Sequence, residues 1–104
     1  MGMVYVHLRI RVGPDGGGAL RAFLREATPF YEAPGGIRVR LLADASDPDR
    51  FIEVVEYEDE GAYERDRRRV EGDPVMKGYL ERWRGLLAEA PVVEVYREEA
   101  GLRG

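Results

Sequence analysis

The sequence predicts a single α+β domain, and three observations lead to that fold class. Apolar and polar residues alternate in four segments, as they do in half-buried strands. Apolar residues recur at intervals of three and four in other segments, as they do in amphipathic helices. The chain has 104 residues, 44% of them hydrophobic, which is enough for one modest core but not for two.

The first alternating segment, residues 4–12, predicts a strand. Its even-numbered positions are all aliphatic, whereas its odd-numbered positions carry Tyr5, His7, Arg9 and Arg11. The aliphatic face needs an apolar cover, which a helix supplies most simply. We therefore expect helices on this face and polar or aromatic side chains on the other.

A glycine- and proline-rich segment, residues 13–18, ends this strand and precedes a helix. Helical periodicity begins at Ala19, and we expect Thr28-Pro29 to kink the helix or end it early. Turn residues at 34–36 then lead into a second strand at 37–42.

A third strand is expected at residues 51–57, after a connection at 43–50. We expect Ile52 and Val54 to face the helices. This orientation places the remaining side chains of the strand on the opposite face: Phe51, Glu53, Val55 and Tyr57.

Two helices and a fourth strand complete the chain. Asp59 is the predicted N-cap of a polar helix that stops at Gly72, and Asp73 with Pro74 begins a more apolar helix. Trp83 recurs at helical spacing in that last helix, which predicts a place in the core. The final strand is expected at 92–96.

The resulting order, βαββααβ, is the ferredoxin-like plan with its second helix broken into two. It gives a four-stranded antiparallel sheet in one domain, residues 1–97, with a loose tail at 98–104. Both helical segments cover one sheet face. The other face is expected to carry Tyr5, His7, Arg9, Arg11, Arg38, Arg40, Leu42, Phe51, Glu53, Val55, Tyr57, Val92, Glu94 and Tyr96.

Apolar residues on an uncovered sheet face predict a homodimer. Small monomers rarely tolerate an exposed apolar patch, and a second copy would bury it. We expect arginines of the first two strands to meet Glu53 and Glu94, within one chain or across the dimer.

Composition excludes several classes of function. The net charge of −4, with acidic and basic residues interleaved, argues against a general nucleic-acid binder. The chain has no cysteine and one histidine, so we expect neither disulfides nor a metal site. No apolar run approaches the ~20 residues of a membrane span, and residues 1–12 do not read as a signal peptide. We therefore expect a cytoplasmic protein with no membrane partner.

Three short motifs resemble the antibiotic biosynthesis monooxygenase (ABM) domain of the dimeric α/β-barrel superfamily. They are PGGI at 34–37, DPDRF at 47–51 and YEDEGAY at 57–63. The resemblance implies that two subunits close an eight-stranded barrel, with a lumen built from the open sheet faces. It also implies an activity that some members show, the oxidation of polycyclic aromatic substrates by O₂ without a cofactor. Related groups degrade haem, dechlorinate, isomerise lactones, or have no known activity.

Three positions depart from the family pattern. Tyr57 stands where the family tends to have tryptophan, Val55 where it has glutamate, and Asp66 where many members carry histidine. The second and third changes remove groups that the family's chemistry can use.

The candidate catalytic residues are His7 and Tyr5. Histidine titrates near neutral pH and can act as a general base. The structural alternative is a hydrogen-bonded histidine in the interface. The candidate substrate-binding residues are Arg9, Arg40, Glu53, Tyr57, Glu94 and Tyr96. Their structural alternative is ion pairing and aromatic packing within the dimer.

These residues support two hypotheses of function. The first is a homodimeric monooxygenase or isomerase that needs no cofactor and acts on a small aromatic or conjugated molecule. The second is a dimer of the same fold that binds a metabolite, or serves a regulatory role, without catalysis. An open cavity of several hundred Å³ would favour the enzyme.

Overall fold

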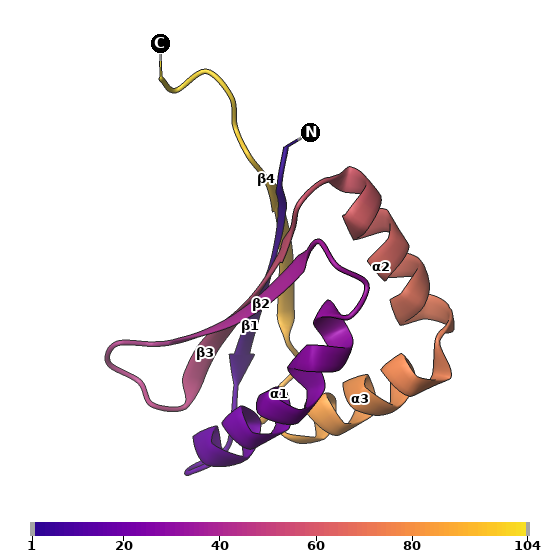
Figure 1. The fold of residues 1–104 in the computed structure, drawn as a ribbon. Coiled ribbons are helices and arrows are strands. Elements are labelled where there is room, and N and C mark those ends of the chain that lie inside the picture. Colours follow the sequence, from indigo (N-terminus) through magenta and orange to yellow (C-terminus); the bar gives the residue numbers. More distant parts are fainter. Residues whose placement is uncertain (1, 104) are drawn as a thin grey trace.

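The computed structural model describes residues 2–103, and it confirms the predicted βαββααβ order (Figure 1). The elements are β1 (Val4–Arg11), α1 (Gly17–Glu32), β2 (Ile37–Ala43), β3 (Arg50–Tyr57), α2 (Glu60–Gly72), α3 (Pro74–Gly85) and β4 (Val92–Arg97). The four strands form one antiparallel sheet in the order β2-β3-β1-β4. All three helices lie on the same side of this sheet (Figure 1).

Both predicted N-caps are confirmed. The side chain of Asp59 accepts a hydrogen bond from Ala62 N at 2.8 Å, at the start of α2. The side chain of Asp73 accepts one from Val75 N at 2.8 Å, at the start of α3. These bonds satisfy backbone donors that a helix start leaves free. The first helix contains Pro29 and continues to Glu32, so the early end, one of the two effects expected of this proline, is wrong.

Strand β3 has the opposite orientation to the one we predicted. Val4 of β1 lies opposite Tyr57, and Leu8 lies opposite Glu53. Directly opposed residues of two strands share one face of the sheet. The side chains on the helix-covered face are therefore Phe51, Glu53, Val55 and Tyr57, whereas Ile52 and Val54 lie on the open face.

The physical reason for this error lies in the composition of β3. Alternation separates the strand into two sets, but it does not say which set meets the helices when both are partly apolar. We took the set with the acidic residue Glu53 to be the outer one. That set also contains the two aromatic residues of the strand, which bury the larger area when they face a core.

Two groups of buried residues join the helices to the sheet, one at each end. The larger group packs α1 and α3 against the end of the sheet that is lower in Figure 1. It includes Ile10, Leu20, Phe23, Met76 and Trp83. The smaller group packs α2 against the other end of the same sheet and consists of Val4, Tyr57 and Ala62. Both groups lie on the helix-covered face, and the cavity described below is lined by members of each.

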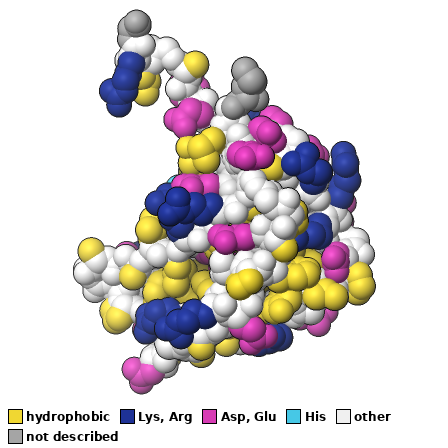
Figure 2. All heavy atoms as spheres, viewed as in Figure 1, with side chains coloured by type: hydrophobic (Ala, Val, Ile, Leu, Met, Phe, Trp, Pro, Cys, Tyr) yellow, Lys and Arg dark blue, Asp and Glu magenta, His cyan; other side chains and the backbone are white. Residues whose placement is uncertain are grey.

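The open face carries several paired polar side chains beside exposed apolar ones. Arg9 Nε lies 2.8 Å from Glu94 Oε1, and Arg40 pairs with Glu56, not with Glu53 as we expected. The rings of His7 and Tyr96 are 5.1 Å apart between centroids. Figure 2 shows acidic and basic side chains interleaved over one side of the molecule. Within residues 2–103, no helix combines the length and apolarity that crossing a membrane requires.

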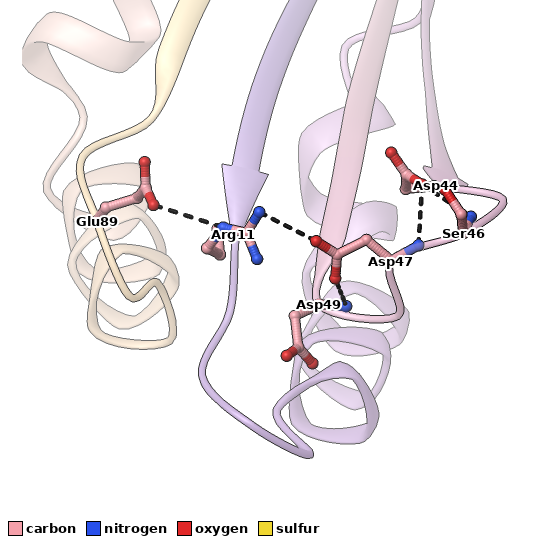
Figure 3. Close-up of polar contacts among 6 residues, drawn as sticks. All are labelled: Arg11, Asp44, Ser46, Asp47, Asp49 and Glu89. Atoms are coloured by element: carbon pink, nitrogen blue, oxygen red, sulfur yellow. Dashed lines mark hydrogen bonds and ion pairs between the residues drawn. The ribbon is translucent and has the colours of Figure 1, made fainter.

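At the end of β1, Arg11 links the loop before β3 to the segment before β4 through two ion pairs (Figure 3). Its side chain lies 3.0 Å from Asp47 Oδ2 and 3.6 Å from Glu89 Oε1. In the loop before β3, Asp44 accepts hydrogen bonds from the backbone N–H groups of Ser46 and Asp47. These donors lower the pKa of the Asp44 carboxyl. The side chains of Asp44, Asp47 and Glu89 at this corner thus have structural partners.

Candidate functional site

A cavity of about 340 Å³ lies between the sheet and the helices. Its floor is the helix-covered face of β1, β2 and β3, with Val6, Leu8, Val39 and Val55 among the lining residues. Residues of α1, α2 and α3 complete the wall, among them Tyr31, Tyr63 and Trp83. A mostly apolar cavity of this volume with a few polar groups is typical of small-molecule sites.

The first polar group in the cavity is Glu53. Its side chain belongs to β3 and is only 4% exposed. Burial raises the pKa of its carboxyl to about 7, and the nearby indole N–H of Trp83 opposes part of that rise. Glu53 Oε1 and Trp83 Nε1 both lack a partner with the geometry of a hydrogen bond. The indole is therefore a weak neighbour of this carboxyl, and desolvation dominates its pKa.

The second polar group is formed by Tyr57 and Asp66, and Arg69 lies beside Asp66 without lining the cavity. The hydroxyl of Tyr57 donates to Asp66 Oδ2 at 2.5 Å, and Asp66 is 8% exposed. Arg69 Nε lies 3.3 Å from Asp66 Oδ1, and the same guanidinium donates to the carbonyl oxygen of Tyr31 at 2.8 Å. Burial and the Asp66 carboxylate both raise the pKa of the Tyr57 hydroxyl, so Tyr57 stays protonated.

The structure divides the eight predicted site residues between the two sheet faces. Glu53 and Tyr57 line the cavity. The other six lie on the open face: Tyr5, His7, Arg9, Arg40, Glu94 and Tyr96. The sheet separates the two sets, so Tyr5 and His7 do not meet Glu53 or Tyr57. Their catalytic role stays a prediction for a ligand bound on the open face.

Apart from Glu53 and Tyr57, the residues that line the cavity were not among our predicted site residues, and three of them illustrate why. Asp66 had one signal in the sequence, because it stands at the family's helix histidine, next to Tyr57 in the folded chain. Trp83 was predicted as core, and it is 5% exposed, but it also lines the cavity beside Glu53. Tyr31 lies at the end of a helix, where spacing alone does not separate a core residue from a cavity residue.

The open face carries a second hollow, of about 560 Å³. It is lined by three arginines, Arg9, Arg11 and Arg50, together with apolar residues such as Ile52 and Val92. Two of these arginines are already paired with carboxylates of the same chain. Among residues 2–103, the His, Asp and Glu side chains form no group of three that could hold a metal ion.

The structure is thus a ferredoxin-like domain with a cavity between its sheet and its helices. The sequence pattern of the antibiotic biosynthesis monooxygenase family matches residues 3–70, and the chain belongs to this family. No protein with a curated description matches the chain.

Several solved structures share the fold. SnoaB, a cofactor-independent oxygenase from Streptomyces nogalater, is 14% identical with a TM-score of 0.78, and the match covers 100% of both chains. A putative antibiotic biosynthesis monooxygenase from Bordetella bronchiseptica is 22% identical with a TM-score of 0.77, over 95% of this chain and 99% of that one. Rv0793 from Mycobacterium tuberculosis is 27% identical with a TM-score of 0.71, over the same shares.

Proposed function

We propose that this protein is a cofactor-independent monooxygenase acting on a small hydroxylated aromatic molecule, which binds in the cavity between sheet and helices. The observation that carries the proposal is the buried carboxyl of Glu53 in a mostly apolar cavity of ligand size. Membership of the monooxygenase family supports it. So does the likeness in fold to SnoaB, which is described as a cofactor-independent oxygenase.

Glu53 is the general base in this proposal. Its pKa of about 7 means that it can accept a proton near neutral pH and release it again. Taking the proton of a substrate hydroxyl leaves a phenolate, whose negative charge is shared with the ring carbon para to the oxygen. The apolar floor and walls exclude water from this anion.

The reaction balances with O₂ as the only co-reactant. The para carbon of the phenolate bonds to one oxygen atom and forms a peroxide. Cleavage of the O–O bond, with loss of the hydrogen on that carbon, leaves a carbonyl group and releases the second oxygen atom as water. For 1-naphthol the products are 1,4-naphthoquinone and one water. The electrons that reduce the second oxygen atom come from the substrate.

Oxygen uptake tests this proposal directly. We expect 1-naphthol to drive O₂ consumption with formation of 1,4-naphthoquinone, and Glu53→Gln to abolish most of that rate. Glu56→Gln is the matched control, because Glu56 lies on the same strand but on the open face. Activity that survives in Glu53→Gln and not in Glu56→Gln would contradict the assignment.

The alternative function is a metabolite-binding or regulatory protein without catalysis. The observation in its favour is that Val55 and Asp66 stand at the positions of the family's glutamate and helix histidine. Both residues line the cavity. Binding of naphthols with no O₂ consumption and no change in the ligand would support this alternative.

The proposal includes a homodimer that docks through the open sheet face. Partly exposed apolar residues on that face include Leu42, Val92 and Tyr96, with exposed fractions of 48%, 54% and 47%. The charges around them have both signs, so an antiparallel copy can pair arginines with glutamates across a two-fold axis. Burying the apolar part would stabilise the dimer by about 25 cal/mol per Å².

A further inference from the structure

We infer that α2 is a movable wall of the cavity, and that the hydrogen bond between Tyr57 and Asp66 holds this helix in its closed position. Movement of α2 away from the sheet widens the mouth of the cavity and controls how fast small molecules enter and leave. The inference goes beyond the proposed function, because it concerns access to the cavity and is independent of the reaction inside.

The mouth of the cavity lies between α2, α3 and β4. The lining side chains of β1, β2 and β3 are all buried or half-buried, and Tyr31 of α1 is buried. The exposed lining residues belong to the other three elements: Arg67, Val70, Glu71, Arg84, Val93 and Val95. Three of these residues lie on α2, so the position of this helix sets the width of the mouth.

Few apolar contacts hold α2 in place. It buries only Ala62 and Asp66, whereas α1 buries six residues and α3 buries the large side chains of Met76 and Trp83. From Asp66 to Glu71, side chains of α2 border the cavity. The helix lies at one edge of the helical layer (Figure 1). A segment with few buried apolar contacts opens at a lower free energy than the whole domain needs to unfold.

Polar contacts fix the middle of α2 instead. The hydroxyl of Tyr57 donates to Asp66 Oδ2 at 2.5 Å, and both residues are buried. One turn later, the guanidinium of Arg69 donates to the carbonyl oxygen of Tyr31 at 2.8 Å. A hydrogen bond to a carboxylate is stronger than one between neutral groups, but water replaces it when the groups become exposed. Such contacts hold the helix closed and still allow it to open reversibly.

The backbone at both ends of α2 is suited to a hinge. Asp59 before the helix has φ −160° and ψ 175°, and Asp73 after it has φ −87° and ψ 118°, so both residues are extended. Asp73 also separates α2 from α3, whose first turn it caps with its side chain. Residues at the ends of an element can absorb changes in φ and ψ while the element moves as a unit. α2 can thus move without losing its helical hydrogen bonds.

Native-state hydrogen exchange of the protein without a ligand tests the opening. Amides at 64–70 in α2 are expected to exchange at least about tenfold faster than those on the buried side of α1. Tyr57→Phe is expected to accelerate exchange in α2 by about fivefold or more, because opening no longer breaks this hydrogen bond. The control Ile10→Val removes one methylene from the core that α1 and α3 cover. It lowers global stability but is expected to leave exchange in α2 within about twofold of the parent.

Two results of this experiment would overturn the inference. Exchange in α2 as slow as that in α1 would mean that the helix opens only when the whole domain unfolds. Equal acceleration of α2 by Ile10→Val and by Tyr57→Phe would mean the same. Asp66→Asn removes the charge from the acceptor and is expected to accelerate α2 as Tyr57→Phe does. No acceleration in either variant would refute the role of this hydrogen bond.

Thiol labelling tests whether the opening controls access to the cavity. The chain has no cysteine, so Val55→Cys places a single thiol on the cavity floor, where the native valine is half-buried. In this background, Tyr57→Phe is expected to speed the reaction of the thiol with the neutral reagent 4,4′-dithiodipyridine by about fivefold or more. Ile10→Val is expected to change the rate by less than about twofold. Equal labelling rates with and without Tyr57→Phe would show that α2 does not control entry and would overturn the inference.

Discussion

The two faces of the sheet differ in how their charged side chains are paired. On the open face, Arg9 pairs with Glu94 and Arg40 pairs with Glu56, each on a neighbouring strand. On the helix-covered face, Glu53 Oε1 is buried without a hydrogen-bond partner. Folding alone gives no reason to bury such an atom, since an unpaired polar group costs about 1–3 kcal/mol. The comparison separates a face on which ion pairs join neighbouring strands from a face with an unpaired buried carboxyl, and the proposed function rests on that carboxyl.

The largest effect that this comparison predicts is on turnover. Glu53→Gln is expected to lower the rate of oxygenation by about 10²–10³-fold, as is typical for the loss of a general base. His7→Gln is expected to lower it far less, because His7 lies on the other side of the sheet. Initial rates of O₂ uptake measure both. A larger loss in His7→Gln would place the chemistry on the open face.

The second prediction concerns stability and its dependence on pH. The pKa of Glu53 is raised from 4.5 to about 7 on folding, so the folded chain binds this proton more tightly than the unfolded chain does. The contribution of Glu53 to stability is therefore greatest below about pH 4.5, falls as the pH rises toward 7, and then levels off. Ionised Glu53 costs about 3 kcal/mol at pH 8.

Glu53→Gln removes that cost. The variant is expected to be more stable than the parent by up to about 3 kcal/mol at pH 8, and by much less at pH 4.5. Urea unfolding at the two pH values measures the difference. A variant that loses stability at pH 8 would show that the carboxylate is paired in the folded protein, contrary to the site described above.

The third prediction tests the open face as a docking surface. The parent chain is expected to have about twice the 11.8 kDa of one chain in solution. Tyr96→Arg adds a positive charge near Arg9 and should weaken the dimer at least tenfold. Light scattering at micromolar concentration gives the mass, with Lys77→Glu on the exposed surface of α3 as the control. A parent mass of 11.8 kDa would refute the dimer.

The smallest effect is expected from Tyr57→Phe on stability. The change leaves the ring in place and removes the donor to Asp66, so it should cost about 1–2 kcal/mol. Thermal unfolding measures this loss, and Tyr5→Phe provides the comparison, because the Tyr5 hydroxyl donates to the exposed Glu98. Equal losses in the two variants would mean that the buried bond contributes no more than the exposed one.

The sequence was sufficient to predict the order of the elements because each signal is local. The N-caps Asp59 and Asp73, the alternation in β1 and the turn at 34–36 each act within a few residues, and all survive in the structure. The fold class follows from that order.

The candidate site was harder to predict because it depends on how strands pair. A register shift of one residue moves every side chain of a strand to the other face. For β3 this moved Glu53 and Tyr57 from the open face to the cavity, away from His7 and Arg9. The contact between Tyr57 and Asp66 also requires α2 to pack on β3, which no local pattern shows.

The central claim is that the ligand binds on the helix-covered face, and Trp83 gives the most direct test. It is the only tryptophan, and its indole N–H lies beside Glu53, so it supplies one separate signal in a ¹H–¹⁵N spectrum. The proposed substrate 1-naphthol is expected to shift this signal in a saturable way, while the side chains of the open face, such as the ring of His7, keep theirs. A saturable shift at His7 with the Trp83 signal unmoved would contradict the account.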